Sequence, residues 1–237
     1  MPDSIALSVL KELFPEGIDY GTNMLIEFQP DSVWYESSLT IAANALSQHL
    51  RTEYHTFEHI PNEVRKALAR LGSDVKKLEG EDMLRVLDSY TAQTGLGVPV
   101  VPEGSPYQSM KLTDWSITAA KSIRSQADKR RLHIDDNVSV LSRYNPENSI
   151  VDFWRTRMIP LSRANEMIVL NSITLGVHPE AFYRQFESLC DGIIEFRSQE
   201  EGGRIQQLVR IKVLRGKAYD SRWHQLQILE NGAVQVD

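Results

Sequence analysis

One short segment of the chain carries side chains that could act on a phosphate group. It follows a predicted buried strand over residues 23–28 and leads into a helix that we predict to begin at Ser37 or Ser38. Loops that bind nucleotide phosphates join a strand to a helix with the pattern Gly-x4-Gly-Lys-Ser/Thr. In this register Asp31 and Glu36 stand at the two glycines, Ser37 stands at the lysine and Ser38 at the Mg²⁺-binding hydroxyl. Only the hydroxyl of the pattern is kept.

The residues that replace the glycines and the lysine disfavour phosphate chemistry. The carboxylates of Asp31 and Glu36 would face a polyanion, and their Cβ atoms would crowd a tight loop that glycine leaves open. Trp34 and Tyr35 would also have to fit in the same loop. We therefore expect that the loop does not support ordinary ATP hydrolysis, while weak or altered nucleotide binding stays open. Ser38 is better explained as the N-cap of the following helix.

The histidines show no familiar metal or catalytic spacing. The sequence contains no Cys-x2-Cys, no His-Glu-x2-His and no Gly-x-Ser-x-Gly. His55 and His59 are four residues apart, but they straddle a predicted strand end instead of sharing a helix face. His133 lies in a predicted buried strand, where we expect a core histidine with a hydrogen-bond partner.

Length and composition bound the class of protein. The 237 residues, 41% apolar and 24% charged, are enough for one large α/β domain or two small ones. No apolar run approaches the roughly 18 residues of a membrane span, and the start Met-Pro-Asp-Ser lacks the regions of a signal peptide, so we expect no membrane contact. The single cysteine, Cys190, cannot form an internal disulfide, which favours a cytoplasmic protein.

The charge of the chain bears on its partners. A net charge of −6 and a pI near 5.6 give no general attraction to nucleic acid. Residues 1–100 are acidic, whereas residues 197–224 hold an excess of arginine and lysine. These two regions could meet between copies of the chain, or they could be two solvated faces.

Helices and strands are predicted to alternate along most of the chain. Hydrophobic spacing predicts strands over 23–28, 52–57, 83–87, 130–134 and 166–170, with helices over 4–14, 37–50, 62–71, 112–127, 149–164 and 179–189. Two hairpins follow, one pairing 193–196 with 208–213 and one pairing 225–229 with 233–236. This order predicts an α/β fold with a mostly parallel central sheet, helices on both faces and C-terminal antiparallel strands. Residues 89–110, rich in glycine and proline, form a long loop that we expect to be functional or mobile.

Several motifs in this order resemble the KaiC-type branch of the RecA-like ATPases. They comprise residues 13–26, Thr56-Phe-Glu-His through Leu71-Gly-Ser-Asp-Val75, Leu132-His-Ile-Asp-Asp136, Cys190-Asp-Gly-Ile-Ile194 and Lys212-Val-Leu-Arg-Gly216. The resemblance covers nearly the whole chain. It implies a single KaiC/RecA-like domain over 1–237, with a three-layer fold, an N-terminal helix and turn over 1–20 and an antiparallel extension over 192–237.

The same resemblance implies roles for three residues. Glu58 matches the first glutamate of the catalytic pair that activates water, and Asp135 matches the aspartate that, with a hydroxyl at Ser38, would orient Mg²⁺. Arg215 matches the arginine that reaches the γ-phosphate of a neighbouring subunit, but Val213 replaces the lysine that accompanies it. Two of them have a structural alternative, since Asp135 could cap a turn and Arg215 could be a solvated or salt-bridged strand residue.

These observations favour a non-catalytic KaiC/RecA-like protein with a degenerate nucleotide site. It would act as a regulatory or scaffold protein in an archaeal or bacterial cytoplasm, binding a protein partner, a catalytic homologue or further copies of itself. No cofactor is expected, although ATP with Mg²⁺ would bind if the site were retained. One alternative is an atypical ATP-binding protein or ATPase that uses Glu58, Asp135 and Arg215. The other is a DNA-repair recombinase paralogue with basic patches at 121–131 and 197–224, against which the acidic net charge weighs.

Overall fold

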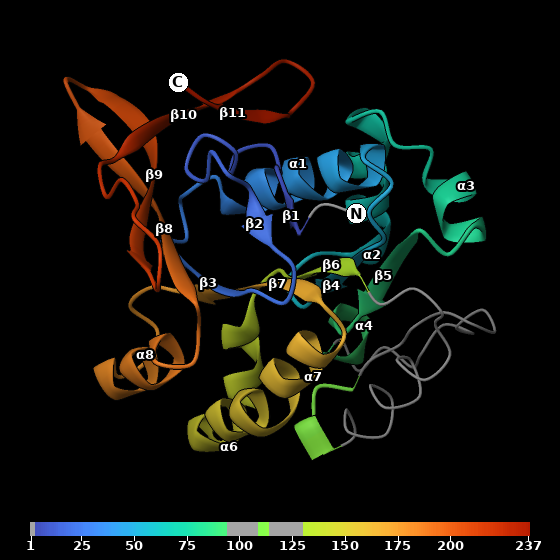
Figure 1. The fold of residues 1–237 in the computed structure, drawn as a ribbon, viewed down its shortest axis with the longest axis vertical. Helices are drawn as coiled ribbons and strands as arrows, with labels where there is room; N and C mark the ends of the chain where they lie inside the picture. Colours follow the sequence, from blue (N-terminus) through green and yellow to red (C-terminus); the bar gives the residue numbers. More distant parts are fainter. Residues whose placement is uncertain (1–2, 94–108, 114–129) are drawn as a thin grey trace.

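The computed structural model describes residues 3–93, 109–113 and 130–237. In this part of the chain, nine strands form one sheet in the order β11-β10-β9-β8-β3-β7-β6-β4-β5 (Figure 1). The strands are β3 (Asn23–Phe28), β4 (Thr52–Thr56), β5 (Leu84–Asp88), β6 (Arg131–Asp135), β7 (Met167–Thr174), β8 (Gly192–Glu201), β9 (Arg204–Leu214), β10 (His224–Ile228) and β11 (Val234–Val236).

The strands from β5 to β8 are parallel, and the last three strands extend the sheet in antiparallel fashion. β8 and β9 form a long hairpin whose turn, Gly202 and Gly203, has positive φ at both residues, as a tight two-residue turn requires. Gly232, also at positive φ, turns β10 into β11. The predicted fold class and both predicted hairpins are confirmed.

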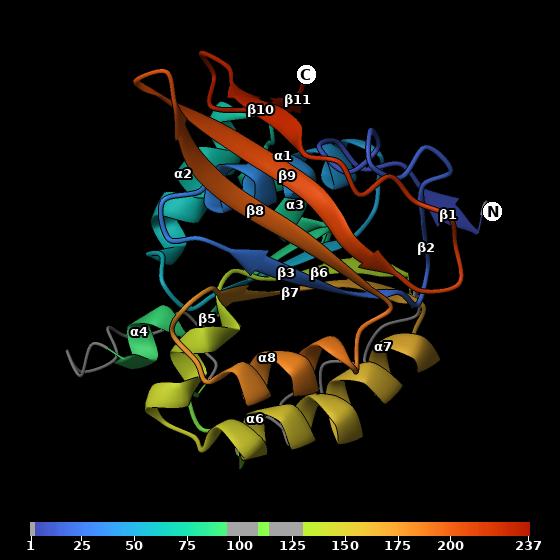
Figure 2. The same ribbon diagram turned by 90° about the vertical axis from the view of Figure 1, so that its left-hand side faces the viewer.

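Helices cover both faces of the sheet, as Figure 2 shows. One face packs against α1 (Trp34–Ser47) and α2 (Pro61–Arg70), and α3 (Val75–Gly80) follows at the edge. The other face packs against η1 (Val138–Arg143), a continuous helical run made of α6 (Glu147–Phe153), η2 (Trp154–Met158) and α7 (Ile159–Ala164), and α8 (Glu180–Glu187). A short α4 (Tyr90–Gln93) follows β5. Two hydrophobic cores result, one on each side of the sheet, because parallel strands are apolar on both faces.

The predicted helix over residues 4–14 is wrong. Residues 4–5 form strand β1 (Ser4–Ile5), paired with β2 (Ile18–Asp19), and turns follow from residue 8 to residue 13. Val9 has a φ of 69°, which ends any regular helix, and the apolar side chains of the segment are buried against the α1 side of the sheet. Burial explains the apolar residues of this segment without a helix.

The predicted helix over 149–164 is present but irregular. A π-helical turn over Trp154–Met158 precedes Pro160. Proline has no N–H to donate to the preceding turn, so a wider turn accommodates it without breaking the helix.

Two further predictions fall mainly outside the described residues, namely the helix over 112–127 and most of the loop over 89–110. Among the helices that the structure describes, none is both long enough and apolar enough to cross a membrane.

Candidate functional site at the carboxyl ends of the parallel strands

The loop between β3 and α1 occupies the position where a phosphate-binding loop would lie. β3 ends at Phe28 and α1 begins at Trp34, three residues before the earliest start that we predicted. A strand–Gly-x4-Gly-Lys-Ser/Thr–helix unit placed on these ends puts Phe28 and Val33 at the glycines. Trp34 then stands at the lysine and Tyr35 at the hydroxyl, so the predicted register of Asp31, Glu36, Ser37 and Ser38 is shifted by three residues.

Trp34 fills the start of the helix. Its side chain is 2% exposed, and its ring centroid lies 5.2 Å from that of Phe196 on β8. The indole N–H donates a hydrogen bond of 3.2 Å to the backbone carbonyl of Asp136, directly after β6. A large buried ring thus joins the first turn of α1 to β8 and to the residue that follows β6.

The loop itself is tied to the β8–β9 hairpin. The N–H of Val33 donates to Gln207 Oε1 at 3.1 Å, and Gln207 Nε2 donates to the carbonyl of Asp31 at 3.2 Å. The Asp31 carboxylate accepts a hydrogen bond from Ser198 Oγ, and the N–H of Ser32 donates to the carbonyl of Gln29. At least two of the backbone N–H groups in this loop are therefore occupied by the protein.

Ser37 and Ser38 lie one turn inside α1, where both are buried. Ser37 Oγ donates to the carbonyl of Val33 at 2.7 Å. Ser38 Oγ lies 2.7 Å from the carbonyl of Tyr35 and 2.8 Å from the hydroxyl of Tyr54. The prediction that Ser38 caps the helix is wrong, because a serine inside a helix bonds back to the preceding turn.

Asp136 organises the turn that follows β4, a role that its position in the sequence does not indicate. Its carboxylate accepts hydrogen bonds from the N–H of Phe57 at 2.7 Å and from Thr56 Oγ1 at 3.1 Å, and it lies 3.0 Å from His59 Nδ1. The His59 ring stacks on Tyr35 with centroids 3.6 Å apart. Burial, with the nearby charge of Asp136, raises the pKa of Tyr35 to about 12, so its hydroxyl stays neutral.

Glu58 is exposed at the rim of a pocket of about 310 Å³. The pocket lies where β3, β4, β6 and β7 end, the usual position of ligands in open α/β sheets. Its wall also includes Phe28, Pro30, Asn137, Ser139, Val140, Ser142, Arg143, Thr174 and Val177. Glu58 and the start of the loop that follows β3, at Pro30, therefore line the same pocket.

Asp135 points to the opposite face of the sheet from Ser38. Ser38 contacts Tyr54, which packs beneath α1, whereas the next residue of β4, His55, points to the other face and lies 3.1 Å from Asp135. Burial alone would raise the pKa of Asp135, but the charge and hydrogen bond of His133 hold it well below its usual value. The two residues that we predicted to share Mg²⁺ are thus not brought together.

His133 is buried and hydrogen-bonded, as predicted for a core histidine. It lies between two carboxylates, those of Glu53 and Asp135, whose charges raise its pKa to about 10 although burial opposes the charged form.

Arg215 lies at the other end of the sheet from Glu58. It follows β9, beside Gly192 at the start of β8, whereas Glu58 follows the carboxyl end of β4. Its guanidinium donates to the carbonyl of Cys190 at 3.0 Å and to that of Glu187 at 3.3 Å. The two residues are separate within one chain, and a role of Arg215 toward a neighbouring copy stays a prediction.

Comparison with known proteins identifies the family of the chain. The family described as KaiC ATPase matches residues 7–237, which is nearly the whole chain. The chain belongs to the KaiC ATPase family. The UPF0273 protein MK0039 of Methanopyrus kandleri is 27% identical over 187 residues, covering 77% of this chain and 70% of that protein.

A solved structure supports the fold of this KaiC-family chain. The KaiC-like protein PH0186 of Pyrococcus horikoshii OT3 matches with a TM-score of 0.75, covering 99% of this chain and 98% of that one. Its identity of 14% carries the fold alone. The mostly parallel sheet, the helices and the antiparallel C-terminal strands are those of a RecA-like domain, as predicted.

Proposed function

We propose that this KaiC-family chain is a non-catalytic member that acts as a regulatory or scaffold protein through contacts with other proteins. The observation that carries the proposal is the burial of Trp34 at the first position of α1. An ATPase needs a lysine at this point to neutralise the β- and γ-phosphates, and needs open backbone around it.

A phosphate group could reach the start of α1 only after Trp34 had left its site. Removing a buried tryptophan side chain from a core typically costs about 3–5 kcal/mol. The helix start also holds Glu36 in its first turn and Asp31 in the preceding loop, and both charges would repel a nucleotide. The occupied loop amides of Ser32 and Val33 oppose phosphate binding further.

The remaining family positions support the same proposal. Glu58 retains its place after β4. The position of the lysine that would polarise a phosphate is held by the indole of Trp34. Ser38 is bonded inside α1, and Asp135 lies on the far face of the sheet. A fold that keeps its shape while these positions change suits a protein whose surface is used for binding rather than for catalysis.

A phosphate-release assay with a matched variant tests the absence of catalysis. We expect wild-type protein and Glu58→Gln to release phosphate from Mg-ATP at the same background rate, because Glu58 has no catalytic role in this account. Release above background in the wild type that falls at least about tenfold in Glu58→Gln, a typical loss for a general base, would overturn the proposal. Light scattering tests the proposed role in protein contacts. We expect the molar mass of the assembly to be the same with and without ATP.

The pocket beside Glu58 favours a second candidate, an atypical ATP-binding protein. Its wall offers Arg143 and hydroxyls at the ends of the strands, which could hold a phosphate or ribose without the backbone N–H groups of Ser32 and Val33. A melting scan separates the candidates, since a ligand at a hundred times its dissociation constant adds about 2.7 kcal/mol of stability. Protection by Mg-ATP that disappears in Arg143→Ala, and not in the distant Arg184→Ala, would favour the second candidate.

A further inference from the structure

A block of four polar side chains lies within the sheet, on the face away from α1. β4 and β6 are parallel neighbours whose register pairs Glu53 with His133 and His55 with Asp135. Because side chains alternate along a strand, all four point to the same face. Exposed fractions are 6% for Glu53, 1% for His55, 4% for His133 and 0% for Asp135.

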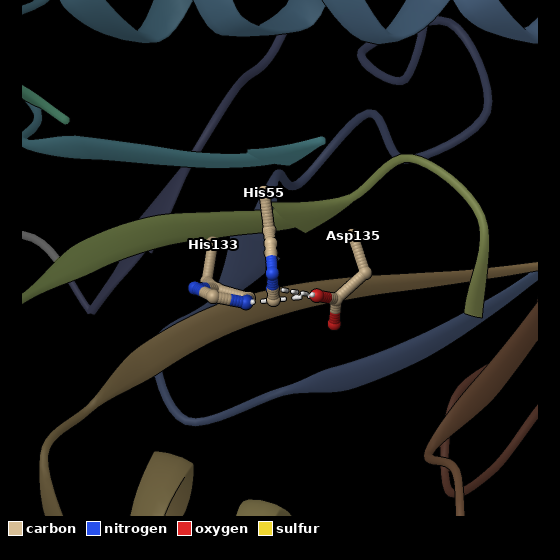
Figure 3. A group of neighbouring side chains, drawn as sticks. All are labelled: His55, His133 and Asp135. Carbon is tan, nitrogen blue, oxygen red and sulfur yellow. Dashed lines mark hydrogen bonds and ion pairs between the residues drawn. The ribbon is translucent and has the colours of Figure 1, made fainter. Parts of the chain in front are cut away.

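Three of these side chains converge on one point, as Figure 3 shows. His55 Nδ1 lies 3.1 Å from Asp135 Oδ1, and His133 Nε2 lies 3.2 Å from the same oxygen. One ligand atom from each residue lies within 4.8 Å of the others. We propose that His55, His133 and Asp135 bind a divalent transition-metal ion, for which Zn²⁺ is the natural probe.

The spacing of these atoms fits a metal site as well as it fits hydrogen bonds. Zinc binds imidazole nitrogen and carboxylate oxygen at about 2.0–2.2 Å, so two ligands of a tetrahedral site lie about 3.3 Å apart. The two nitrogen–oxygen distances of 3.1 and 3.2 Å are close to this separation between two zinc ligands. Two imidazoles with one carboxylate is also a donor set that suits zinc and other first-row divalent metals.

The partners behind the two histidines are those that metal-bound histidines usually have. His133 Nδ1 lies 3.2 Å from Glu53 Oε2, and His55 Nε2 lies 2.8 Å from Ser89 Oγ. A ring N–H directed at a carboxylate or an oxygen acceptor orients the imidazole and leaves its other nitrogen to face the metal. Glu53 is in turn held near two guanidinium groups, those of Arg85 and Arg131.

A second, independent observation lies in Asp135 itself. Its Oδ2 is buried and has no hydrogen-bond partner among the described residues, whereas both histidines approach Oδ1. A buried carboxylate oxygen without a partner is costly. A metal ion at the cluster would give Oδ2 a partner, because a carboxylate can bind through both oxygens.

The bound ion would join β4 to β6, near the β5 edge of the sheet. Thr56, which follows His55, and Asp136, which follows Asp135, form the hydrogen-bonded turn at the carboxyl ends of these strands. The ion would therefore fix the strand pair that carries this turn. This inference stands apart from the proposed function, since it requires neither nucleotide binding nor its absence.

Zinc content measures the proposal directly. Protein would be prepared in two ways, by expression in zinc-supplemented medium and by refolding with one equivalent of Zn²⁺, then desalted and analysed by mass spectrometry. Because the cluster is closed, refolding ensures that access does not limit uptake. We expect about one zinc per chain, as for a site whose binding energy is coupled to folding.

Variants and a wild-type measurement make the test decisive. His55→Gln and Asp135→Asn should retain less than about a tenth of the zinc, since the loss of a ligand exceeds the 10–100-fold cost of losing an outer partner. His49→Asn, at an exposed histidine, should bind as the wild type does. Wild-type protein loaded with Co²⁺ should also show the intense visible absorption of a tetrahedral site, which requires no variant to fold.

Two outcomes would overturn the proposal. Folded wild-type protein that holds no stoichiometric zinc after both preparations would show that the cluster is a hydrogen-bonded network of protonated imidazole and carboxylate. Zinc held equally by the wild type, His55→Gln and Asp135→Asn would place the metal elsewhere in the chain.

Discussion

The indole of Trp34 and the backbone carbonyl of Asp136 are joined by a hydrogen bond of 3.2 Å. This contact links the first residue of α1 to the residue after β6. The side chain of Asp136 meanwhile fixes the turn after β4. The same two residues therefore hold together the ends of three elements, α1, β4 and β6.

Trp34→Ala should lower the free energy of unfolding by about 3–5 kcal/mol, because the ring is buried against Phe196 and leaves a cavity. Urea denaturation followed by circular dichroism measures the change. Trp223→Ala is the matched control, since that ring is only half-buried beside Arg197 and Arg210 and should cost much less. Equal losses in the two variants would contradict a structural role for Trp34.

Asp136→Ala should destabilise the protein by about 3 kcal/mol or more, because it removes a buried charged acceptor from several donors at once. The comparison is Asp152→Ala, whose carboxylate forms an exposed ion pair with Arg155 and should contribute about 0.5 kcal/mol or less. Thermal melting of both variants gives the ranking. If the Asp136 variant melts with the wild type, the turn is held by other contacts.

Glu27 should make stability depend on pH. Burial and the nearby Glu187 raise the pKa of Glu27 to about 7, although Lys212 opposes the shift. The folded protein then binds a proton more tightly than the unfolded chain, so this contribution is fully present below about pH 4.5 and is lost as pH rises toward 7.

Glu27→Gln isolates that effect from other groups. Relative to the variant, the wild type should lose up to about 3 kcal/mol of unfolding free energy between pH 4.5 and pH 8. Urea titrations at several pH values measure the difference. A difference that does not change with pH would mean that Lys212 keeps Glu27 ionised throughout.

Loss of Gln207 should loosen the β3–α1 loop without affecting the sheet. Gln207→Ala removes two hydrogen bonds, to the N–H of Val33 and the carbonyl of Asp31, each worth about 1 kcal/mol. Amide hydrogen exchange should rise in residues 29–33 and stay constant in the neighbouring β3. Gln206→Ala, on the opposite side of β9, is the control. An equal rise of exchange in the two variants would show that Gln207 does not specifically hold the β3–α1 loop.

Much of the fold could be predicted from local signals. The hairpin of β8 and β9 followed from a Gly-Gly turn between apolar runs, and the alternation of strands with helices fixed the parallel sheet. The segment before Gly17 could not be predicted, because Val9 adopts a left-handed conformation that only tertiary packing supports. Its apolar residues bury themselves through turns instead of along a helix.

The candidate sites depended on information that local patterns lack. Serine is a good N-cap, so the local pattern predicts a helix start at Ser38, whereas α1 begins about one turn earlier, at the buried Trp34. The direction of the Asp136 side chain follows from the alternation of side chains along a strand. Asp136 lies two residues after Ile134, and so on the same side of the sheet, beneath α1. To predict that His55 lies near His133, one must know that β6 lies between β4 and β7 in the sheet. Local sequence patterns do not reveal this strand order.

Isothermal titration of the purified chain with Mg-ATP and Mg-ADP tests the central claim most directly. With Trp34 in the place of the phosphate-binding lysine, we predict no heat of binding at nucleotide concentrations up to about 1 mM, the weak end of specific affinity. Binding with a dissociation constant of about 1 μM, some 8 kcal/mol, would require the loop over residues 29–33 to open around the nucleotide. That result would contradict the account and place the ATP-binding alternative ahead of it.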